Sequence, residues 1–203
     1  MRMNLPNQIT VARFFLAIVF LSLLAVFDCR RADAQQWLLD AAVVLFIVAA
    51  ISDALDGYLA RRQNQVTSFG RVLDPFADKL LVAGTFVMML GTGFVDEAGR
   101  NTTGLAAWMV VVIVARELLV SGLRGFSESK GKPYAANYWG KGKMFVQSVT
   151  IPVILVTLGR WREFDSAILL RSIMIWLTVG ITALSVVAYL FASRDVFAER
   201  SRE

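Results

Sequence analysis

Two pairs of aspartates lie in a chain in which 57% of the residues are hydrophobic. Asp53 and Asp56 are three residues apart and Asp74 and Asp78 are four apart, so on helices each pair shares a face. A carboxylate near the centre of a membrane costs roughly 2.5–3.5 kcal/mol, so the four need cations, water or ligand as compensation. A divalent cation between them would keep them ionised despite their mutual repulsion.

The available ligand types restrict the metal. The chain has no histidine and a single cysteine, Cys29, which argues against a zinc or haem site and an intrachain disulfide. Oxygen-only ligation selects hard ions, Mg²⁺ or Mn²⁺ before any softer metal. Cys29 is expected to be a bystander in a short loop.

Small residues and a cation follow the first aspartate pair. Gly57 and Ala60 leave one helix face almost without side chains, which favours either helix–helix packing or a flat ligand against the backbone. Arg61, one turn after Gly57, is suited to phosphate oxygens. For Asp74 the alternative is a helix N-cap with Pro75 at the first helical position, although this does not explain Asp78.

The whole run has a familiar pattern. It reads Asp53-x2-Asp56-Gly57-x2-Ala60-Arg61-x8-Gly70-x3-Asp74-x3-Asp78. It resembles the signature of the CDP-alcohol phosphotransferases. The resemblance implies a membrane enzyme of six transmembrane helices that transfers a phosphatidyl group from CDP-diacylglycerol to an alcohol and releases CMP.

The resemblance also implies roles for individual residues. The metal ions would be held by Asp53, Asp56, Asp74 and Asp78, and Asp78 would also take the proton from the attacking hydroxyl. CDP-diacylglycerol would be bound by Asp56, Gly57, Ala60, Arg61, Gly70 and Thr10. These roles agree with general chemistry, because two metal ions stabilise attack on a diphosphate and a carboxylate base activates the hydroxyl.

Further charged residues are candidates for the acceptor site. Arg116 and Arg124 are eight residues apart, about two helical turns, so they project from similar faces and suit an acceptor phosphate. The alternative is a structural pair of Arg116 with Glu117 or an aspartate. Arg13 could simply snorkel to the interface, and Lys141 and Lys143 could serve only as positive residues on the cytoplasmic side.

Three segments narrow the resemblance to the bacterial phosphatidylglycerophosphate synthases. They are Leu5-Pro6-Asn7-x2-Thr10-x2-Arg13, Ala115-Arg116-Glu117-Leu118-x2-Ser121-Gly122-Leu123-Arg124 and Gly140-Lys141-x-Lys143-x3-Gln147. The implied acceptor is glycerol 3-phosphate, with acceptor-site residues Arg116, Arg124, Glu117, Arg13, Lys141 and Lys143. A two-fold homodimer is also implied. Met144 departs from the small hydroxyl residue expected there.

Other functions remain open at this stage. The same chemistry could use serine, inositol phosphate or phosphatidylglycerol as acceptor, although an acceptor without a phosphate has little use for both arginines. A divalent-cation transporter would line a path with the aspartates, but it would not need Gly57, Ala60 and Arg61 at these spacings. A purely structural membrane protein would not need the aspartates.

The elements that position these residues are hydrophobic segments. The 203 residues predict a single domain, 1–203, with a mean hydropathy of +0.59. Stretches long enough to cross a bilayer occur at 12–27, 38–60, 73–94, 105–124, 144–159 and 172–193. We therefore expect an all-α integral membrane bundle of six spans.

The distribution of Lys and Arg predicts the orientation. These residues gather at the N-terminus, in the second and fourth connections and at the C-terminus, so both termini and the active site should face the cytoplasm from the inner membrane. The net charge of +5 follows from this bias, and nucleic-acid binding is not expected. A cleavable signal peptide is the alternative for the first stretch, but Arg30 and Arg31 lie where its cleavage region should be uncharged.

Overall fold

The computed structural model describes the backbone of residues 5–63, 68–129 and 138–198, and side chains over 8–53, 73–127 and 142–189 and at 129 and 140. Within these ranges the chain folds into helices and contains no strand. The helices are α1 (Leu5–Val26), α2 (Ala32–Gln63), α3 (Ser68–Met88), α4 (Ala107–Ser129), α5 (Tyr138–Gly159) and α6 (Asp165–Ala198). The predicted all-α class is confirmed, and each predicted hydrophobic stretch overlaps one helix.

Four segments are long and apolar enough to cross a membrane. They are Gln8–Val26, Cys29–Asp53, Gly142–Gly159 and Asp165–Tyr189. The two remaining helices, α3 and α4, are interrupted by the charged residues singled out above, which makes them less apolar. The chain is thus a helical protein with several candidate membrane spans.

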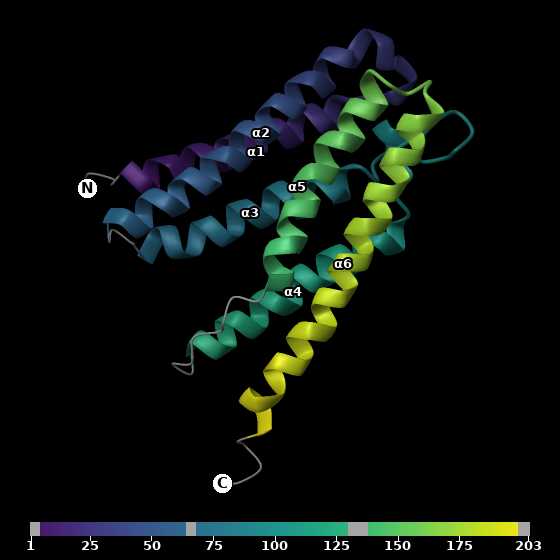
Figure 1. The fold of residues 1–203 in the computed structure, drawn as a ribbon. Helices are drawn as coiled ribbons and strands as arrows, with labels where there is room; N and C mark the ends of the chain where they lie inside the picture. The colour runs from purple at the N-terminus through teal and green to yellow at the C-terminus, as the bar shows by residue number, and fades with distance from the viewer. Residues whose placement is uncertain (1–4, 64–67, 130–137, 199–203) are drawn as a thin grey trace.

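The helices pack as two connected groups (Figure 1). Helix α1 contacts α2 and α3, while α6 contacts α4 and α5, and α2 packs against α5 between the groups. The turns that join α1 to α2, α3 to α4 and α5 to α6 lie at one end of the molecule. We call this the turn end. The C-terminal ends of α2, α4 and α6 and the N-terminal ends of α3 and α5 lie away from it.

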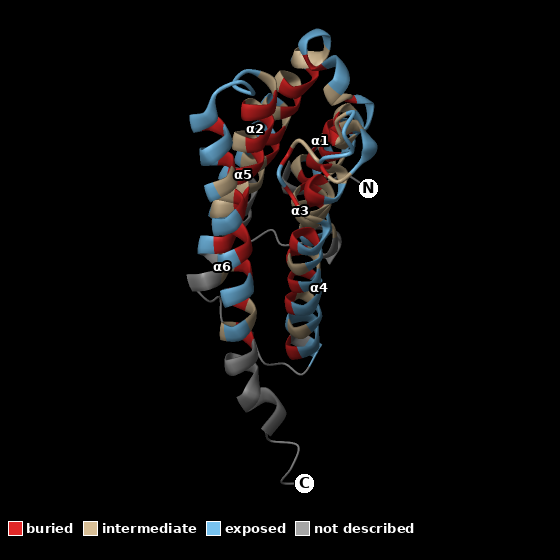
Figure 2. Cartoon of the chain, turned by 90° about the vertical axis from the view of Figure 1, so that its right-hand side faces the viewer, coloured by how far each residue is buried: buried red, intermediate tan, exposed pale blue. Residues whose placement is uncertain are grey.

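The helices are buried on their inner faces and exposed on their outer faces (Figure 2), and both faces carry large apolar side chains. Phe20, Phe46 and Ile154 are almost completely buried between them. Val111 and Leu118 of α4 are 64% and 65% exposed, so large apolar side chains also face outward. A helix that is apolar all round is typical of a membrane span, because its outer face contacts lipid.

The turn end is tightly packed. Short 3-10 helices, η1 (Cys29–Arg31) and η2 (Thr92–Phe94), contact each other there, which places Cys29 in a short connection as predicted. A Cβ on Gly93 would lie 2.0 Å from the carbonyl oxygen of Phe27, so this approach requires glycine. In the following loop the backbone N–H and Nε of Arg100 donate to Asp96, and these hydrogen bonds lower the pKa of the Asp96 carboxyl.

The structure contradicts one alternative that the sequence left open. Helix α3 begins at Ser68, so Asp74 and Pro75 lie within it rather than at its N-cap and first position. Pro75 has no N–H to donate to the carbonyl of Arg71, which removes one helical hydrogen bond. The ammonium of Lys79 donates to the Pro75 carbonyl at 3.1 Å. Asp74 and Asp78 are therefore on one helix face by continuous helical geometry.

Candidate active site

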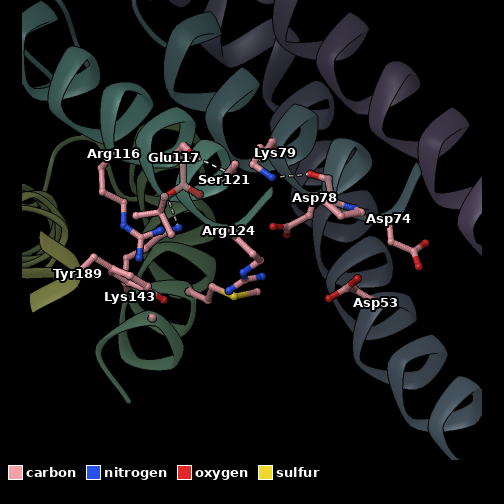
Figure 3. Close-up of a pocket in the computed structure, with 14 residues that line it drawn as sticks. Asp53, Asp74, Asp78, Lys79, Arg116, Glu117, Ser121, Arg124, Lys143 and Tyr189 are labelled. Carbon is pink, nitrogen blue, oxygen red and sulfur yellow. Dashed lines mark hydrogen bonds and ion pairs between the residues drawn. The ribbon is translucent and has the colours of Figure 1, made fainter. Parts of the chain in front are cut away.

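A pocket of about 360 Å³ lies between the two groups of helices (Figure 3). It is lined from α2, α3, α4, α5 and α6. Its lining consists of Asp53, Asp74, Pro75, Asp78, Lys79, Arg116, Glu117, Val120, Ser121, Arg124, Gly140, Lys143, Met144 and Tyr189. Most charged residues predicted from the sequence are thus gathered in one place, from segments far apart in the chain.

One wall of the pocket is acidic. Asp53 comes from α2 and Asp74 and Asp78 come from α3, and Figure 3 shows the three carboxylates on the same side. The structure therefore brings together three of the four aspartates whose spacing predicted a site. We refer to Asp53, Asp74 and Asp78 as the acidic wall.

Helix α1 supports the acidic wall from behind. The hydroxyl of Thr10 donates to Oδ1 of Asp74 at 2.6 Å, and Nη1 of Arg13 forms an ion pair with Oδ1 of Asp53. Both Thr10 and Arg13 are almost fully buried, and neither lines the pocket. The structure places them as supports of two aspartates, and the predicted binding of donor by Thr10 and of acceptor by Arg13 stays a prediction.

The opposite wall is basic and contains one buried carboxylate. Oε1 of Glu117 accepts from Nη1 of Arg116 at 3.2 Å and also pairs with the ammonium of Lys143. All three side chains are buried. Two cations that share one carboxylate leave an excess of positive charge facing the acidic wall. The predicted structural pair of Arg116 with Glu117 does form, and it forms within the pocket lining.

Helix α6 fixes the position of Arg116. Nε of Arg116 donates to the Ser185 hydroxyl at 2.8 Å, and its guanidinium lies 5.2 Å from the centre of the Tyr189 ring. A Cβ on Gly140 would lie 2.8 Å from the Tyr189 hydroxyl, so α5 leaves room for this ring. Ser185 and Tyr189 were not predicted from the sequence. The sequence feature that could have indicated them is a pair of polar residues four positions apart in an apolar stretch.

Arg124 differs from the other cations of the pocket. Its side chain is exposed, it lines the pocket, and it forms no hydrogen bond or ion pair with any residue in the described part of the chain. Figure 3 shows it between the acidic wall and the buried Arg116–Glu117–Lys143 cluster. Its guanidinium is therefore available to an anionic ligand.

The comparison with known families decides the assignment. Residues 3–184 match the family model described as CDP-alcohol phosphatidyltransferase. The chain belongs to the CDP-alcohol phosphatidyltransferase family. The match includes α1 to α5 and part of α6, and Tyr189 is the one pocket-lining residue beyond it.

Curated relatives in this family share a name, CDP-diacylglycerol–glycerol-3-phosphate 3-phosphatidyltransferase. The Bacillus subtilis protein is 39% identical over 158 residues, covering 75% of this chain and 77% of its own length. The Rickettsia bellii protein is 34% identical and covers 96% of this chain and 97% of its own length. The Escherichia coli K12 protein is 31% identical with the same two coverages.

At six predicted site residues the structure describes the backbone but not the side chain. These residues lie in α2, α3 and α5 and are Asp56, Gly57, Ala60, Arg61, Gly70 and Lys141. Their roles stay predictions.

The acidic wall has the residue types of a site for hard metal ions. Among the residues with described side chains, no group of three His, Cys, Asp or Glu is placed to hold a metal ion. The fourth aspartate of the signature, Asp56, is not in that set. The donor atoms are carboxylate oxygens throughout, and this is the chemistry that Mg²⁺ and Mn²⁺ prefer. The residue types therefore fit such ions.

Proposed function

We propose that this protein transfers the phosphatidyl group of CDP-diacylglycerol to glycerol 3-phosphate, which gives phosphatidylglycerophosphate and CMP in phospholipid biosynthesis. The observation that carries this proposal is one pocket with an acidic wall on α2 and α3 and a basic wall on α4 and α5. The shared name of the relatives supports the choice of substrates.

The reaction requires a proton acceptor beside the attacking hydroxyl. The hydroxyl oxygen forms a bond to the phosphorus that carries diacylglycerol, the bond from that phosphorus to the bridging oxygen breaks, and CMP leaves with this oxygen. Mg²⁺ or Mn²⁺ held by Asp53, Asp56, Asp74 and Asp78 would neutralise diphosphate charge and stabilise the leaving group. The hydroxyl proton passes to a carboxylate.

Asp78 is the best placed of the aspartates to be that base. A second, smaller space beside the main pocket is lined by Asp78 together with Glu117 and Lys143, but not by Asp53 or Asp74. Asp78 thus borders the basic wall. An acceptor whose phosphate binds the basic wall can extend its hydroxyl towards Asp78.

The cations that can interact with the acceptor phosphate differ in whether they already pair with a protein carboxylate. Arg124 is exposed and uncommitted among the described residues, whereas Arg116 and Lys143 are held by Glu117. We assign Arg124 the direct contact with the phosphate. Arg116 and Lys143 supply a fixed positive field, and Glu117 positions them. Lys141 is proposed to add to this field.

The position of the pocket suggests a topology. We propose that all six helices cross the inner membrane with both termini in the cytoplasm, because Lys and Arg are concentrated on that side. Asp53 lies late in α2, Asp78 early in α3 and Lys143 early in α5, so the pocket lies towards the end opposite the turn end. Water-soluble acceptor would then enter from the cytoplasm. A homodimer is also proposed from the family resemblance.

The test is acceptor-dependent release of CMP. Purified protein in uncharged detergent would receive CDP-diacylglycerol, Mg²⁺ and one acceptor at a time: glycerol 3-phosphate, serine or inositol phosphate. We expect release with glycerol 3-phosphate and its loss when a chelator is added. Release with serine alone would contradict the role of the basic wall, and release that survives the chelator would contradict the metal assignment.

A further inference from the structure

A second large pocket lies at the turn end, away from the candidate active site. It has a volume of about 440 Å³ and is lined by residues of the three connections, of the adjoining ends of α2 and α5, and of the first turns of α6. Its lining includes three arginines, Arg100, Arg162 and Arg171, and one carboxylate, Glu163. An excess of positive charge in a cleft favours an anionic ligand.

Arg171 is the unusual member of this pocket. It is only 9% exposed, and it forms no hydrogen bond or ion pair with any residue in the described part of the chain. Arg162 pairs with Asp33 at 2.5 Å, and Arg100 pairs with Asp96 at 3.2 Å. No Arg171 nitrogen is among the fully buried, partnerless polar atoms of the described residues, so the guanidinium reaches the pocket and can pair there with a bound anion.

Arg171 lies near the start of α6, beside aromatic and apolar side chains that are exposed at the turn end. It lies six residues into α6, about 9 Å along the helix axis. Trp161 and Phe164, just before α6, are exposed aromatic residues of the kind found at membrane–water interfaces. Ile168 lines the pocket and is 40% exposed, so the pocket borders the lipid-facing surface.

From this arrangement we infer that the turn-end pocket binds a phosphate group, with Arg171 as its buried ligand and Arg100 and Arg162 at its mouth. The ligand chemistry is that of a phosphate ester. An anionic phospholipid headgroup and free phosphate both carry this chemistry, and the apolar border at Ile168 favours the lipid. This site is separate from the proposed catalytic reaction and does not depend on it.

The single cysteine offers a direct measurement. Cys29 lines this pocket and is the only cysteine in the chain, so its alkylation reports on the turn end without background. The rate of reaction with N-ethylmaleimide would be measured on purified protein in uncharged detergent. Phosphatidylglycerol, zwitterionic phosphatidylcholine or inorganic phosphate would be added separately. At ten times its Kd a protecting ligand leaves about one tenth of the sites free, so the rate should fall about tenfold.

The three separate additions distinguish a lipid headgroup from free phosphate as the ligand. Protection by phosphatidylglycerol alone identifies a lipid headgroup, and protection by inorganic phosphate identifies a site that the free ion can fill. Either result supports the proposal. Equal protection by phosphatidylcholine and phosphatidylglycerol, or no protection by any addition, would overturn it.

A variant pair tests the role of Arg171. Arg171→Gln should abolish protection, while Arg160→Gln should retain it, because Arg160 belongs to the same end but pairs with Asp40 and does not line the pocket. Protection that persists in Arg171→Gln would overturn the assignment. CMP release by Arg171→Gln should be unchanged in detergent, which separates this site from the catalytic one.

Thermal unfolding of the wild type and of Arg171→Gln would show whether Arg171 has a purely structural role. Without anionic lipid, Arg171→Gln should melt no lower than the wild type, because it removes a buried charge that has no partner. With phosphatidylglycerol the wild type should gain stability and the variant should not. A large loss of stability in lipid-free Arg171→Gln, together with an unprotected Cys29 in the wild type, would show a structural arginine instead.

Discussion

Arg116 and Arg124 line the same pocket, but the protein holds only one of them. Arg116 is fixed by Glu117, Ser185 and the Tyr189 ring, whereas Arg124 extends from α4 without a partner among the described residues. A cation that contacts the protein on three sides contributes a fixed field, and an uncommitted one can close on a ligand. The two arginines should therefore respond differently to substitution.

Arg124→Ala should raise the KM for glycerol 3-phosphate with little change in kcat. The loss of a charge-assisted hydrogen bond of about 1.5–3 kcal/mol corresponds to an increase of about 10- to 150-fold. Steady-state kinetics with varied acceptor would measure it. Arg160→Ala at the turn end is the matched control. An unchanged KM in Arg124→Ala would move the acceptor phosphate elsewhere.

Asp78→Asn should reduce turnover about 10²- to 10⁴-fold, because the amide cannot take the hydroxyl proton. Binding of CDP-diacylglycerol should stay measurable, since the acidic wall keeps Asp53 and Asp74. Single-turnover kinetics and a donor-binding assay would separate these effects. Asp96→Asn, at the turn end, is the control. Near-wild-type turnover in Asp78→Asn would exclude Asp78 as the base.

At the scale of elements, the pocket depends on a close approach between α5 and α6. A Cβ at Gly140 would lie 2.8 Å from the Tyr189 hydroxyl, whereas a Cβ at Gly142 has no atom within 4 Å. Tyr189 is buried and lies against Arg116, so displacing its ring moves the basic wall. Substitution of Gly140 and of Gly142 therefore compares a crowded and an uncrowded position near the start of the same helix.

Gly140→Ala should lower kcat/KM on the order of 10- to 100-fold, since displacements near 1 Å in an active site have effects of this size. Gly142→Ala should be close to wild type. Parallel assays of both variants, with thermal unfolding to check folding, would test the contact. Equal activities would show that Tyr189 moves aside without consequence for the basic wall.

The sequence predicted the elements better than their contacts. Six helices and the gathering of Asp53, Asp74, Asp78, Arg116 and Arg124 followed from hydrophobicity, spacing and family resemblance. The N-cap alternative for Asp74 is contradicted, because Pro75, which favours the first turn of a helix, here lies inside α3. The supports, Thr10 behind Asp74 and Ser185 behind Arg116, were not predictable as such. Each is a contact between helices far apart in sequence, and no spacing encodes it.

At the scale of the whole molecule, the two pockets lie towards opposite ends of the bundle. The acidic and basic walls lie near the connections of α2 to α3 and of α4 to α5, and the arginine-lined pocket lies at the turn end. If the catalytic pocket faces the cytoplasm, the turn end faces the opposite side of the membrane. Cys29 marks that side.

In right-side-out vesicles made of phosphatidylcholine alone, which leave the turn-end pocket without anionic lipid, Cys29 should react with a membrane-impermeant maleimide. The control is a Cys29→Ser protein carrying Ser129→Cys, whose exposed position at the end of α4 should be protected until the vesicles are opened. Mass shifts of the purified protein would report labelling. The reverse pattern would invert the proposed topology.

Detection of the lipid product would show whether the phosphatidyl group is transferred to glycerol 3-phosphate. Purified protein would be incubated with CDP-diacylglycerol, Mg²⁺ and ¹³C-labelled glycerol 3-phosphate, and the extracted lipid would be analysed by mass spectrometry. We expect labelled phosphatidylglycerophosphate in amounts equal to the CMP released, and almost none with Asp78→Asn. CMP release without label in the lipid would contradict it, because the phosphatidyl group would then have passed to water or to another acceptor.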